Sequence, residues 1–319
     1  MASTTKIMTA LLTIERANLD DVATVPSSAL VGGSSAELVA GERITVRNLL
    51  VGLLVPSGND AALTLAQHIA GGPAAFVAMM NARAQELGLT RTRFTSPHGL
   101  DQPGHYASVR DLVRLAREAM AHEELRSIVR LPRATIPAPG GGTRVLVSQN
   151  DLLGRVPDVD GVKTGHTDGA GYALVMHGRR AGLGIELYGA FIGAPSEAAR
   201  SDDARRLLSW GYSRFARATL VRRGQVFGRA EVRGRPGVTV ALRARRSLVA
   251  PVLLGDELVE RVVAPPEVIA PLVRDTVLGR VTVRVGRREL GSVDLVAATN
   301  VAAPGPADAL RAAWDQVTP

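Results

Sequence analysis

The chain has 319 residues, long enough for two domains, and its 46% hydrophobic and 21% charged residues are typical of a folded globular protein. It has no cysteine, which excludes disulfides, thiolate catalysis and thiolate metal sites, and no apolar stretch of about 18 residues that would span a membrane. The net charge of +8 favours anionic partners, whereas an aromatic content of 3% and scattered basic residues argue against nucleic acid.

Hydrophobic periodicity divides the first part of the chain into helices and short strands. Pro73 and Gly88 mark the beginning and the end of one predicted helix, and Ser108 with Asp111 forms a capping box at the start of another. Helices are predicted over residues 3–17, 47–55, 61–70, 73–88, from 108 onward and over 198–215, and strands near Val22 and Ile44 and over 128–147, 172–177 and 185–192.

The composition changes after about Ala218, where Val, Arg and Gly alternate in short runs as far as Val296 and predict a small all-β domain. A Pro/Ala/Gly linker then leads to a last helix with Leu310, Trp314 and Val317 on one side. We therefore predict an α+β domain over residues 1–217, a β-rich domain over 218–299, and a linker with a short helix over 300–319.

Two lysines stand out, because 36 of the 38 basic residues are arginine. Lys6 belongs to Ser3-x-x-Lys6, a spacing that puts both side chains on one helix face. Lys163 belongs to Lys163-Thr164-Gly165. Arginine does not release its proton in a protein, whereas a buried lysine can, so both lysines are candidates for amine chemistry. Chance, or a pocket that admits only the thinner ammonium, is the alternative explanation.

Ser57-Gly-Asn59 lies between these two motifs. Each motif alone is a weak signal, since Ser-x-x-Lys occurs by chance and Ser-Gly-Asn could be a turn that caps a helix. In this order, Ser-x-x-Lys, Ser-x-Asn and Lys-Thr-Gly form the set found in penicillin-binding proteins and class A β-lactamases. The set predicts a serine nucleophile with a lysine base, whose pKa must be lowered so that the amine is neutral.

The chain resembles the low-molecular-mass penicillin-binding proteins, specifically the serine-type D-alanyl-D-alanine carboxypeptidases of peptidase family S11. Further segments carry the resemblance, which covers nearly the whole chain from Met1 to about Thr299. It implies a β-lactamase/transpeptidase-like α+β domain, an antiparallel sheet flanked by helices, followed by a small all-β domain. The further matching segments are Gly41–Ala62, Phe94–Asp101, Gln149–Leu153, Trp210–Tyr212 and Ala270–Gly279.

The resemblance implies removal of the terminal D-alanine from the pentapeptide stems of peptidoglycan. Ser3 would form an acyl-enzyme, with neutral Lys6 as its base and the Lys163 cation keeping Lys6 deprotonated. Ser57 would relay a proton toward the leaving D-alanine. Asn59 would orient Lys6 and the amide of the acyl chain.

The same resemblance assigns substrate binding to the third motif. Lys163 and Thr164, beside Gly165, would hold the substrate carboxylate. The backbone N–H groups of Ser3 and His166 would form the oxyanion hole. Arg200 falls where the family carries a carboxylate-recognising arginine, and a surface arginine on a helix is the alternative reading.

No metal or cofactor is implied. His98 and His105 bracket a Gly-Leu-Asp turn but lack a further ligand at the spacing of zinc peptidases, so we read them as structural. The implied partners are peptidoglycan stem peptides and, as covalent inhibitors, β-lactam antibiotics. The implied location is extracytoplasmic, with peripheral membrane association left open. The stripe at Leu310 lacks the basic face of an amphipathic anchor, so we expect it to pack on the protein or fray.

The family carries a signal peptide and a strand-bearing segment before Ser-x-x-Lys, whereas Met1 stands two residues before Ser3 and no signal peptide is seen here. Either the start is misassigned or trimmed, or the molecule is truncated and its central sheet lacks a strand.

Three other functions compete with the carboxypeptidase. A D,D-endopeptidase would use the same motifs. A β-lactamase is disfavoured, because no Glu-x-x-x-Asn loop lies between Ser57 and Lys163. The shortened start motivates an inactive wall-binding homologue.

Overall fold

The computed structural model describes residues 1–306 and divides into two compact units. The first comprises residues 1–181 and 185–212, and the second comprises residues 182–184 and the chain from Ser213 onward. Each unit has its own hydrophobic core. The α+β fold followed by a small β region, predicted from the sequence, is confirmed.

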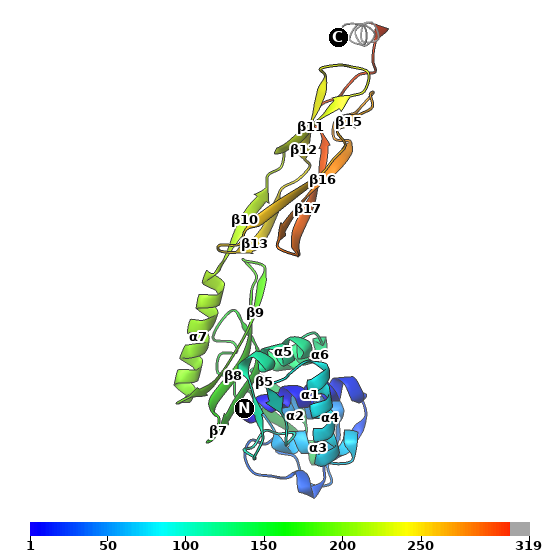
Figure 1. Cartoon of the computed structure of the whole chain (residues 1–319). Coiled ribbons are helices and arrows are strands. Elements are labelled where there is room, and N and C mark those ends of the chain that lie inside the picture. Colours follow the sequence, from blue (N-terminus) through cyan, green and yellow to red (C-terminus); the bar gives the residue numbers. More distant parts are fainter. Residues whose placement is uncertain (307–319) are drawn as a thin grey trace. The chain divides into compact units, whose positions relative to one another are not determined.

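The first unit is built from helices around one antiparallel sheet (Figure 1). Several helices begin or end where the sequence signals predict, including α4, which starts at Pro73, and α3, which ends at the left-handed Gly71. The helices are the 3₁₀ turn η1 Ala2–Thr5, α1 Lys6–Arg16, η2 Ser27–Ala29, α2 Val46–Leu54, α3 Asn59–Ala70, α4 Pro73–Glu86, α5 Val109–Ala119, α6 Glu123–Val129, η3 Pro139–Gly141 and α7 Glu197–Ser213.

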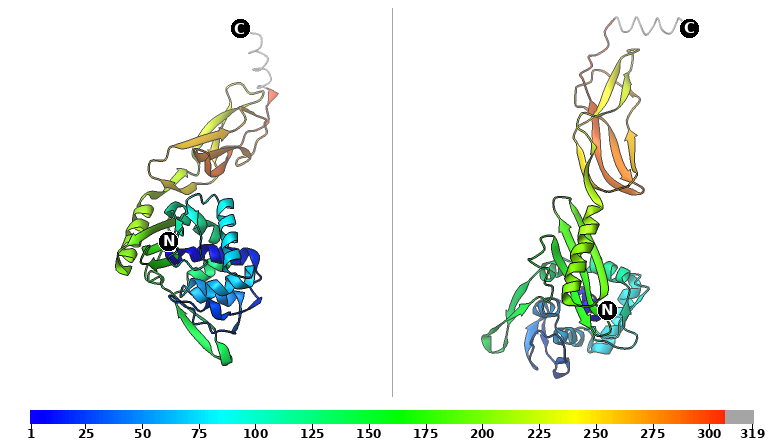
Figure 2. Two further views of the ribbon diagram at one scale, coloured as in Figure 1. Left: turned by 60° about the horizontal axis from the view of Figure 1, so that its bottom comes forward. Right: turned by 90° about the vertical axis from the view of Figure 1, so that its left-hand side faces the viewer.

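The sheet of the first unit has the order β7-β8-β9, and both pairs are antiparallel. Helices α1–α6 lie on one face of it and α7 on the other (Figures 1 and 2). The strands are β7 Val159–Thr167, β8 Gly171–Arg180 and β9 Ile185–Ala194, with three outlying pairs formed by β1 Val22–Thr24 and β2 Arg43–Thr45, β3 Thr92–Arg93 and β4 Tyr106–Ala107, and β5 Arg133–Pro137 and β6 Thr143–Val147.

The core of the first unit lies between the sheet and the six helices of its inner face. Leu11 of α1, Leu49 of α2, Leu65 of α3 and Phe76 of α4 are fully buried there, together with Val175 of β8. Their spacing follows the apolar period that predicted the helices. Motif residues at the ends of these elements are thus carried by rigid, packed segments.

Three details of the sequence prediction were wrong. Residues 128 and 129 belong to the end of α6, not to a strand, because Glu123 and Glu124 occupy its first turn and its apolar residues follow the helical period. The capping box is half formed: Ser108 Oγ accepts the Asp111 N–H at 3.2 Å, but the Asp111 carboxylate accepts the Arg91 N–H and the Thr92 hydroxyl instead. The helix predicted over 198–215 ends at Ser213, because Phe215 already belongs to the next strand.

The second unit is all-β in its described part. Its main sheet has the order β14-β16-β17-β12-β11-β15, and β10 pairs with β13. Alternate residues such as Val240 and Leu242 of β12 are buried, as the alternating sequence predicts. The strands are β10 Phe215–Val221, β11 Val226–Val232, β12 Thr239–Ala244, β13 Leu248–Leu253, β14 Leu258–Val263, β15 Glu267–Val268, β16 Val277–Val285 and β17 Arg288–Ala297.

The predicted last helix with Leu310, Trp314 and Val317 lies outside the described residues. Within residues 1–306, no single helix is long and apolar enough to cross a membrane, and the one helix pair that meets these criteria jointly, α3 with α4, is bent by 85°.

The segment from Phe94 to Asp101 crosses over the first turn of the chain. Thr9 of α1 donates its hydroxyl to the Pro97 carbonyl at 2.6 Å, and the Gly99 N–H donates to Ser96 Oγ at 3.0 Å. Gly99 has a φ of +93°, and a Cβ there would collide with the Ala2 carbonyl oxygen and lie 2.8 Å from Thr5 Oγ1. This position therefore requires glycine for both its dihedral angle and its space.

We expect Gly99→Ala to lower the free energy of unfolding by about 2–4 kcal/mol, since it combines a strained φ with overpacking against backbone. Gly104→Ala is the matched control: its φ is +75°, but the nearest atoms to a Cβ lie 3.9 Å away. The control should lose about 1 kcal/mol at most. Urea denaturation measures both, and equal losses would contradict the close approach of Gly99 to the first turn.

Candidate active site

Ser3 and Lys6 lie at the junction of η1 and α1, where one helical turn brings their side chains together. Lys6 is fully buried and Ser3 is half-buried. The Lys6 Nζ lies 3.0 Å from Ser3 Oγ, 2.7 Å from Asn59 Oδ1 and 2.7 Å from the His98 carbonyl oxygen. The amine is thus surrounded by three oxygen atoms from three separate segments.

Burial lowers the pKa of Lys6 well below its ordinary value, the nearby Lys163 charge lowers it further, and Asp60 opposes both effects. A neutral amine has two N–H groups and one lone pair. The carbonyl oxygens of Asn59 and His98 act only as hydrogen-bond acceptors, so the two N–H groups of the amine donate to them. The lone pair is then left for the Ser3 hydroxyl, which is the arrangement that a general base needs.

Asn59 and Ser57 are held at the N-terminal end of α3. The Asn59 backbone N–H donates to the Ser34 carbonyl and its Nδ2 donates to the Gly32 carbonyl, both at 2.8 Å. Ser57 is fully buried with a φ of +70°, an uncommon conformation for serine. Its hydroxyl has no hydrogen-bond partner within the described residues. A buried hydroxyl without a partner, on a residue with a strained backbone, is typical of a side chain that binds a ligand.

Asp60 is a residue of this region that the sequence analysis missed. Its buried carboxylate accepts the backbone N–H groups of Ala36 at 2.9 Å and Leu38 at 3.1 Å, and the Ser35 hydroxyl at 2.6 Å. It thereby holds the loop that supplies the partners of Asn59. Its place directly after Ser57-Gly-Asn59 was the only available signal.

Lys163, Thr164 and Gly165 lie in the middle of strand β7, and Lys163 and Thr164 are buried. Lys163 Nζ donates to the Thr164 carbonyl at 3.0 Å. Burial, and secondly the charge of Arg200, lower the pKa of Lys163 to about 7. A Cβ at Gly165 would lie 3.0 Å from both the Ala2 Cβ and the Ser3 nitrogen. Glycine therefore lets β7 pack directly against the turn that carries Ser3.

His166 and Arg200 flank this strand. The exposed His166 ring stacks on Tyr172 with ring centroids 4.0 Å apart. Arg200 is buried on α7 and forms ion pairs with Asp151 at 3.0 Å and Glu197 at 2.8 Å. Its guanidinium is therefore already paired with carboxylates, although its charge is felt at Lys163.

Asp101 is a second residue that the motifs did not single out. Its carboxylate accepts the Thr167 hydroxyl at 2.7 Å and the Gly169 N–H at 3.0 Å. These bonds connect the segment that covers the first turn to the loop that follows β7. The hydrogen bond from Thr167 is the main cause that holds the pKa of the Asp101 carboxyl below its ordinary value, and the hydrogen bond from the Gly169 N–H is the second.

Both His98 and His105 make hydrogen bonds within the fold, and His98 Nδ1 accepts the Leu100 N–H at 3.1 Å. Within residues 1–306 there is no group of three His, Cys, Asp or Glu side chains that could hold a metal ion. The Thr5 hydroxyl donates to the Ala2 carbonyl at 2.8 Å, so His105 Nε2, 2.8 Å from Thr5 Oγ1, must be the donor in that contact. His105 Nδ1 accepts the Thr95 N–H at 3.0 Å. These bonds assign the neutral Nε2–H tautomer to His105.

Comparison with known proteins identifies relatives of both units. Residues 1–195 match the family model described as D-alanyl-D-alanine carboxypeptidase, and residues 215–303 match that of the penicillin-binding protein 5 C-terminal domain. The chain is 38% identical over 244 residues to D-alanyl-D-alanine carboxypeptidase DacD of Salmonella typhimurium, an alignment that covers 71% of this chain and 60% of DacD. The chain thus spans less than two thirds of the length of that relative.

Other matches cover more of the chain. It is 31% identical over 329 residues to D-alanyl-D-alanine carboxypeptidase DacC of Escherichia coli, covering 94% of this chain and 78% of DacC. The structure of penicillin binding protein 5 from Haemophilus influenzae is similar, with a TM-score of 0.64, 29% identity, and coverage of 94% of this chain and 90% of that one. The Streptomyces K15 DD-transpeptidase matches 66% of this chain and 87% of its own, with a TM-score of 0.62 and 33% identity.

The tautomer of His105 predicts a pH-dependent stability. Burial is the main cause that lowers the pKa of His105 to about 4, from an ordinary value of 6.5. As the pH falls, the unfolded chain therefore protonates His105 before the folded protein does. The contribution of His105 to the free energy of unfolding is complete above pH 6.5 and is lost as the pH falls toward 4. Protonated Nδ1 would face the Thr95 N–H.

We expect the free energy of unfolding of the wild type to fall between pH 6.5 and pH 4.5 more steeply than that of His105→Gln, by about 1–2 kcal/mol. Burial likewise lowers the pKa of His98 to about 4, and His98 makes its own contribution to the pH dependence of the free energy of unfolding in both proteins. Exposed His68, changed to Gln, is the control and should follow the wild type. Parallel curves for the wild type and His105→Gln would contradict the assigned tautomer.

Proposed function

The chain belongs to the D-alanyl-D-alanine carboxypeptidase family, and from this premise we propose that its first unit removes the terminal D-alanine from the pentapeptide stems of peptidoglycan. The observation that carries the proposal is the buried Lys6 amine, 3.0 Å from Ser3 Oγ and surrounded by oxygen acceptors. We propose a catalytic domain over residues 1–217, followed by the β-rich domain over 218–299 and the segment 300–319.

In the proposed acylation, Ser3 Oγ attacks the carbonyl carbon of the penultimate D-alanine while its proton passes to Lys6 Nζ. The negative charge that develops on the carbonyl oxygen is stabilised by the backbone N–H groups of Ser3 and His166. The bond to the terminal D-alanine nitrogen then breaks, leaving an ester on Ser3. Water hydrolyses this acyl-enzyme and regenerates the serine.

Ser57 and Asn59 serve the leaving group and the base. The departing nitrogen needs a proton, and the buried hydroxyl of Ser57, which has no hydrogen-bond partner among residues 1–306, is our candidate for relaying it from Lys6. Asn59 Oδ1, at 2.7 Å from Lys6 Nζ, fixes the direction of the amine lone pair. We propose that the Asn59 side chain also orients the amide of the acyl chain.

The terminal carboxylate of the stem peptide would bind at β7, on the Thr164 hydroxyl and the Lys163 ammonium, with Gly165 allowing the strand to approach Ser3. Arg200 contributes through its positive charge, because Asp151 and Glu197 already occupy its guanidinium. We place the protein outside the cytoplasm, where peptidoglycan stem peptides and β-lactam antibiotics are available, and we keep peripheral membrane association as a proposal.

A fluorescent penicillin tests the acyl-enzyme directly. We expect intact-mass measurement to show one covalent adduct on Ser3, absent in Ser3→Ala. Lys6→Arg should lower the acylation rate by at least about 10³-fold, because a guanidinium keeps its proton and cannot act as the base. Acylation of Lys6→Arg at the wild-type rate would refute the role of Lys6, and a folded wild type without an adduct would refute the enzyme proposal.

Two further measurements separate the related activities. Release of D-alanine from a pentapeptide, but not from a cross-linked dimer, identifies the carboxypeptidase, and cleavage of the dimer identifies an endopeptidase. A penicillin adduct that persists for minutes fits a penicillin-binding protein, whereas rapid turnover of the antibiotic would identify a β-lactamase.

The pKa of Lys163 predicts how substrate capture depends on pH. With a pKa of about 7 in the free protein, Lys163 loses its charge as the pH rises through neutrality. We therefore expect kcat/KM for a carboxylate-bearing substrate to decline above about pH 7. A bound carboxylate raises the pKa of Lys163, so kcat should decline only at higher pH.

Lys163→Arg keeps a permanent charge at this position. Steady-state rates from pH 5.5 to 9.5 should show no alkaline decline of kcat/KM near pH 7 for this variant, even if its absolute value is lower. An unchanged decline in Lys163→Arg would assign the titration to another group.

A further inference from the structure

The positive charge of this protein is concentrated in the unit that lacks the catalytic motifs. Residues 213–306 contain 16 arginines and no lysine against 8 acidic residues, a net charge of +8, whereas residues 1–212 carry 21 basic and 20 acidic residues. The excess charge is therefore not needed to build the active site. It marks the β unit as the part of the chain that attracts anions.

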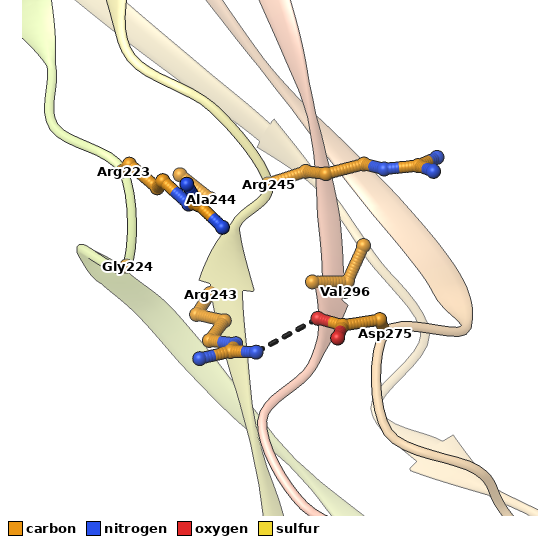
Figure 3. A pocket seen from close by; sticks show the side chains of 7 residues that line it. All are labelled: Arg223, Gly224, Arg243, Ala244, Arg245, Asp275 and Val296. Atoms are coloured by element: carbon orange, nitrogen blue, oxygen red, sulfur yellow. Dashed lines mark hydrogen bonds and ion pairs between the residues drawn. The ribbon is translucent and has the colours of Figure 1, made fainter.

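Three of these arginines line one pocket of about 250 Å³ in the β unit, beside the end of strand β12 (Figure 3). Arg223 comes from the loop between β10 and β11, Arg243 lies in the last part of β12, and Arg245 directly follows the end of that strand at Ala244. The pocket has room for several groups the size of a water molecule, which takes about 30 Å³ in the liquid. Its remaining lining residues are Gly224, Ala244, Asp275 and Val296.

Among the lining residues that the structure describes, Asp275 is the only acidic one, and it is already paired. It accepts from Arg243 at 2.7 Å and lies 3.8 Å from Arg274. Within residues 1–306, no carboxylate forms an ion pair with Arg223 or Arg245, and both side chains are exposed. In Figure 3 the Arg223 and Arg243 side chains lie on one side, and the Arg245 side chain extends from the strand end away from them. Two guanidinium groups thus remain available to an incoming anion.

The arrangement favours a phosphate group over a carboxylate. A carboxylate is planar and is satisfied by one guanidinium fork, and Asp275 already occupies that place on Arg243. A phosphodiester is tetrahedral at phosphorus, so its two non-bridging oxygens and their lone pairs are not confined to one plane with the rest of the group, and guanidinium groups from separate segments can contact it together. Two further exposed arginines are next to these residues in the sequence: Arg222 precedes Arg223, and Arg246 follows Arg245. They add positive charge beside the pocket.

The composition of the β unit argues for a soluble polymer rather than a bilayer or nucleic acid. Residues 213–306 contain no tryptophan and no tyrosine. These are the side chains that favour the membrane interface, and aromatic rings are the surfaces on which unpaired bases stack. The one apolar side chain larger than alanine in the pocket lining, Val296, is buried.

We propose that the β unit binds a poly(polyol phosphate), a linear polymer of small polyhydroxy alcohols linked by phosphodiester groups, and that the Arg223–Arg243–Arg245 pocket holds one of its phosphates. Neighbouring phosphates of the same chain would contact the flanking arginines. Binding releases counterions, so the affinity should fall steeply as salt increases. The site is independent of Ser3 and of the proposed peptidase reaction.

The test uses the full chain and synthetic poly(glycerol phosphate), with affinity measured by calorimetry at several salt concentrations. We expect Arg223→Gln/Arg245→Gln to weaken binding by about tenfold or more and to reduce the slope of log affinity against log salt by about 2. The acylation of Ser3 by penicillin should be unchanged in this double variant, so a failure here is separable from a failure of the proposed reaction.

Arg287→Gln/Arg288→Gln is the matched control. It removes the same charge from exposed arginines at the opposite end of the β16–β17 hairpin, where Val285 pairs with Arg288, whereas Val296 of the pocket pairs with Val277. Binding that falls less than about threefold in this control supports a defined site. Equal losses in the two double variants would overturn it, since diffuse attraction alone would then explain the binding.

Two further probes complete the test. Poly-L-glutamate of equal charge should bind more weakly than poly(glycerol phosphate), and equal or tighter binding would overturn the preference for phosphate. Phosphatidylcholine vesicles containing phosphatidylglycerol should bind less well than the polymer. Vesicle binding that exceeds polymer binding and depends on Arg223 and Arg245 would overturn the polymer in favour of a lipid surface, and no polymer binding at low salt would overturn the proposal altogether.

Discussion

Burial of the Lys6 amine beside Ser3 is the constraint that the surrounding structure has to satisfy. An ammonium removed from water is costly, and the positive charge of Lys163 adds to that cost, so the neutral form is favoured. A neutral amine still has two N–H groups that need acceptors in a buried place, and Asn59 and the His98 carbonyl supply them. The hydrogen bonds of Asp60 hold the loop that fixes Asn59, and those of Asp101 hold the segment that carries the His98 carbonyl. Together they keep the two acceptors in position.

The sequence indicated the parts of the candidate site that depend on side-chain identity and short spacing. Lys6 and Lys163 were conspicuous among arginines, and the serine-lysine spacing already placed Ser3 beside Lys6. The sequence did not predict the contribution of His98, because a backbone carbonyl leaves no signature in the residue type. It missed the role of Asp60 for a related reason: the N–H groups of Ala36 and Leu38, which its carboxylate holds, lie more than twenty residues away in the chain.

The fold was predictable where local signals and burial agree, as in the alternating strands of the β unit and the helices bounded by proline or glycine. It was less predictable at Glu123–Val129, because this seven-residue helix buries only Leu125, Ile128 and Val129, too few apolar positions to tell a helix from a strand in the sequence alone. The distribution of charge was also not evident from the sequence alone. The net charge of the whole chain indicated anionic partners, but only the division into two units at Tyr212 showed that almost all of this net charge belongs to one unit.

The hydrogen bonds of Lys6 join residues that are 53 and 92 positions apart in the chain. Contacts of such sequence separation close long loops, and their entropic cost is recovered only when the packed core has formed around them. The reactivity proposed for Ser3 therefore depends on the complete native unit, because a fragment or a partly folded intermediate lacks these contacts. If Ser3 forms the proposed acyl-enzyme, the yield of covalent label during refolding measures the fraction of molecules in which the last long-range contacts have formed.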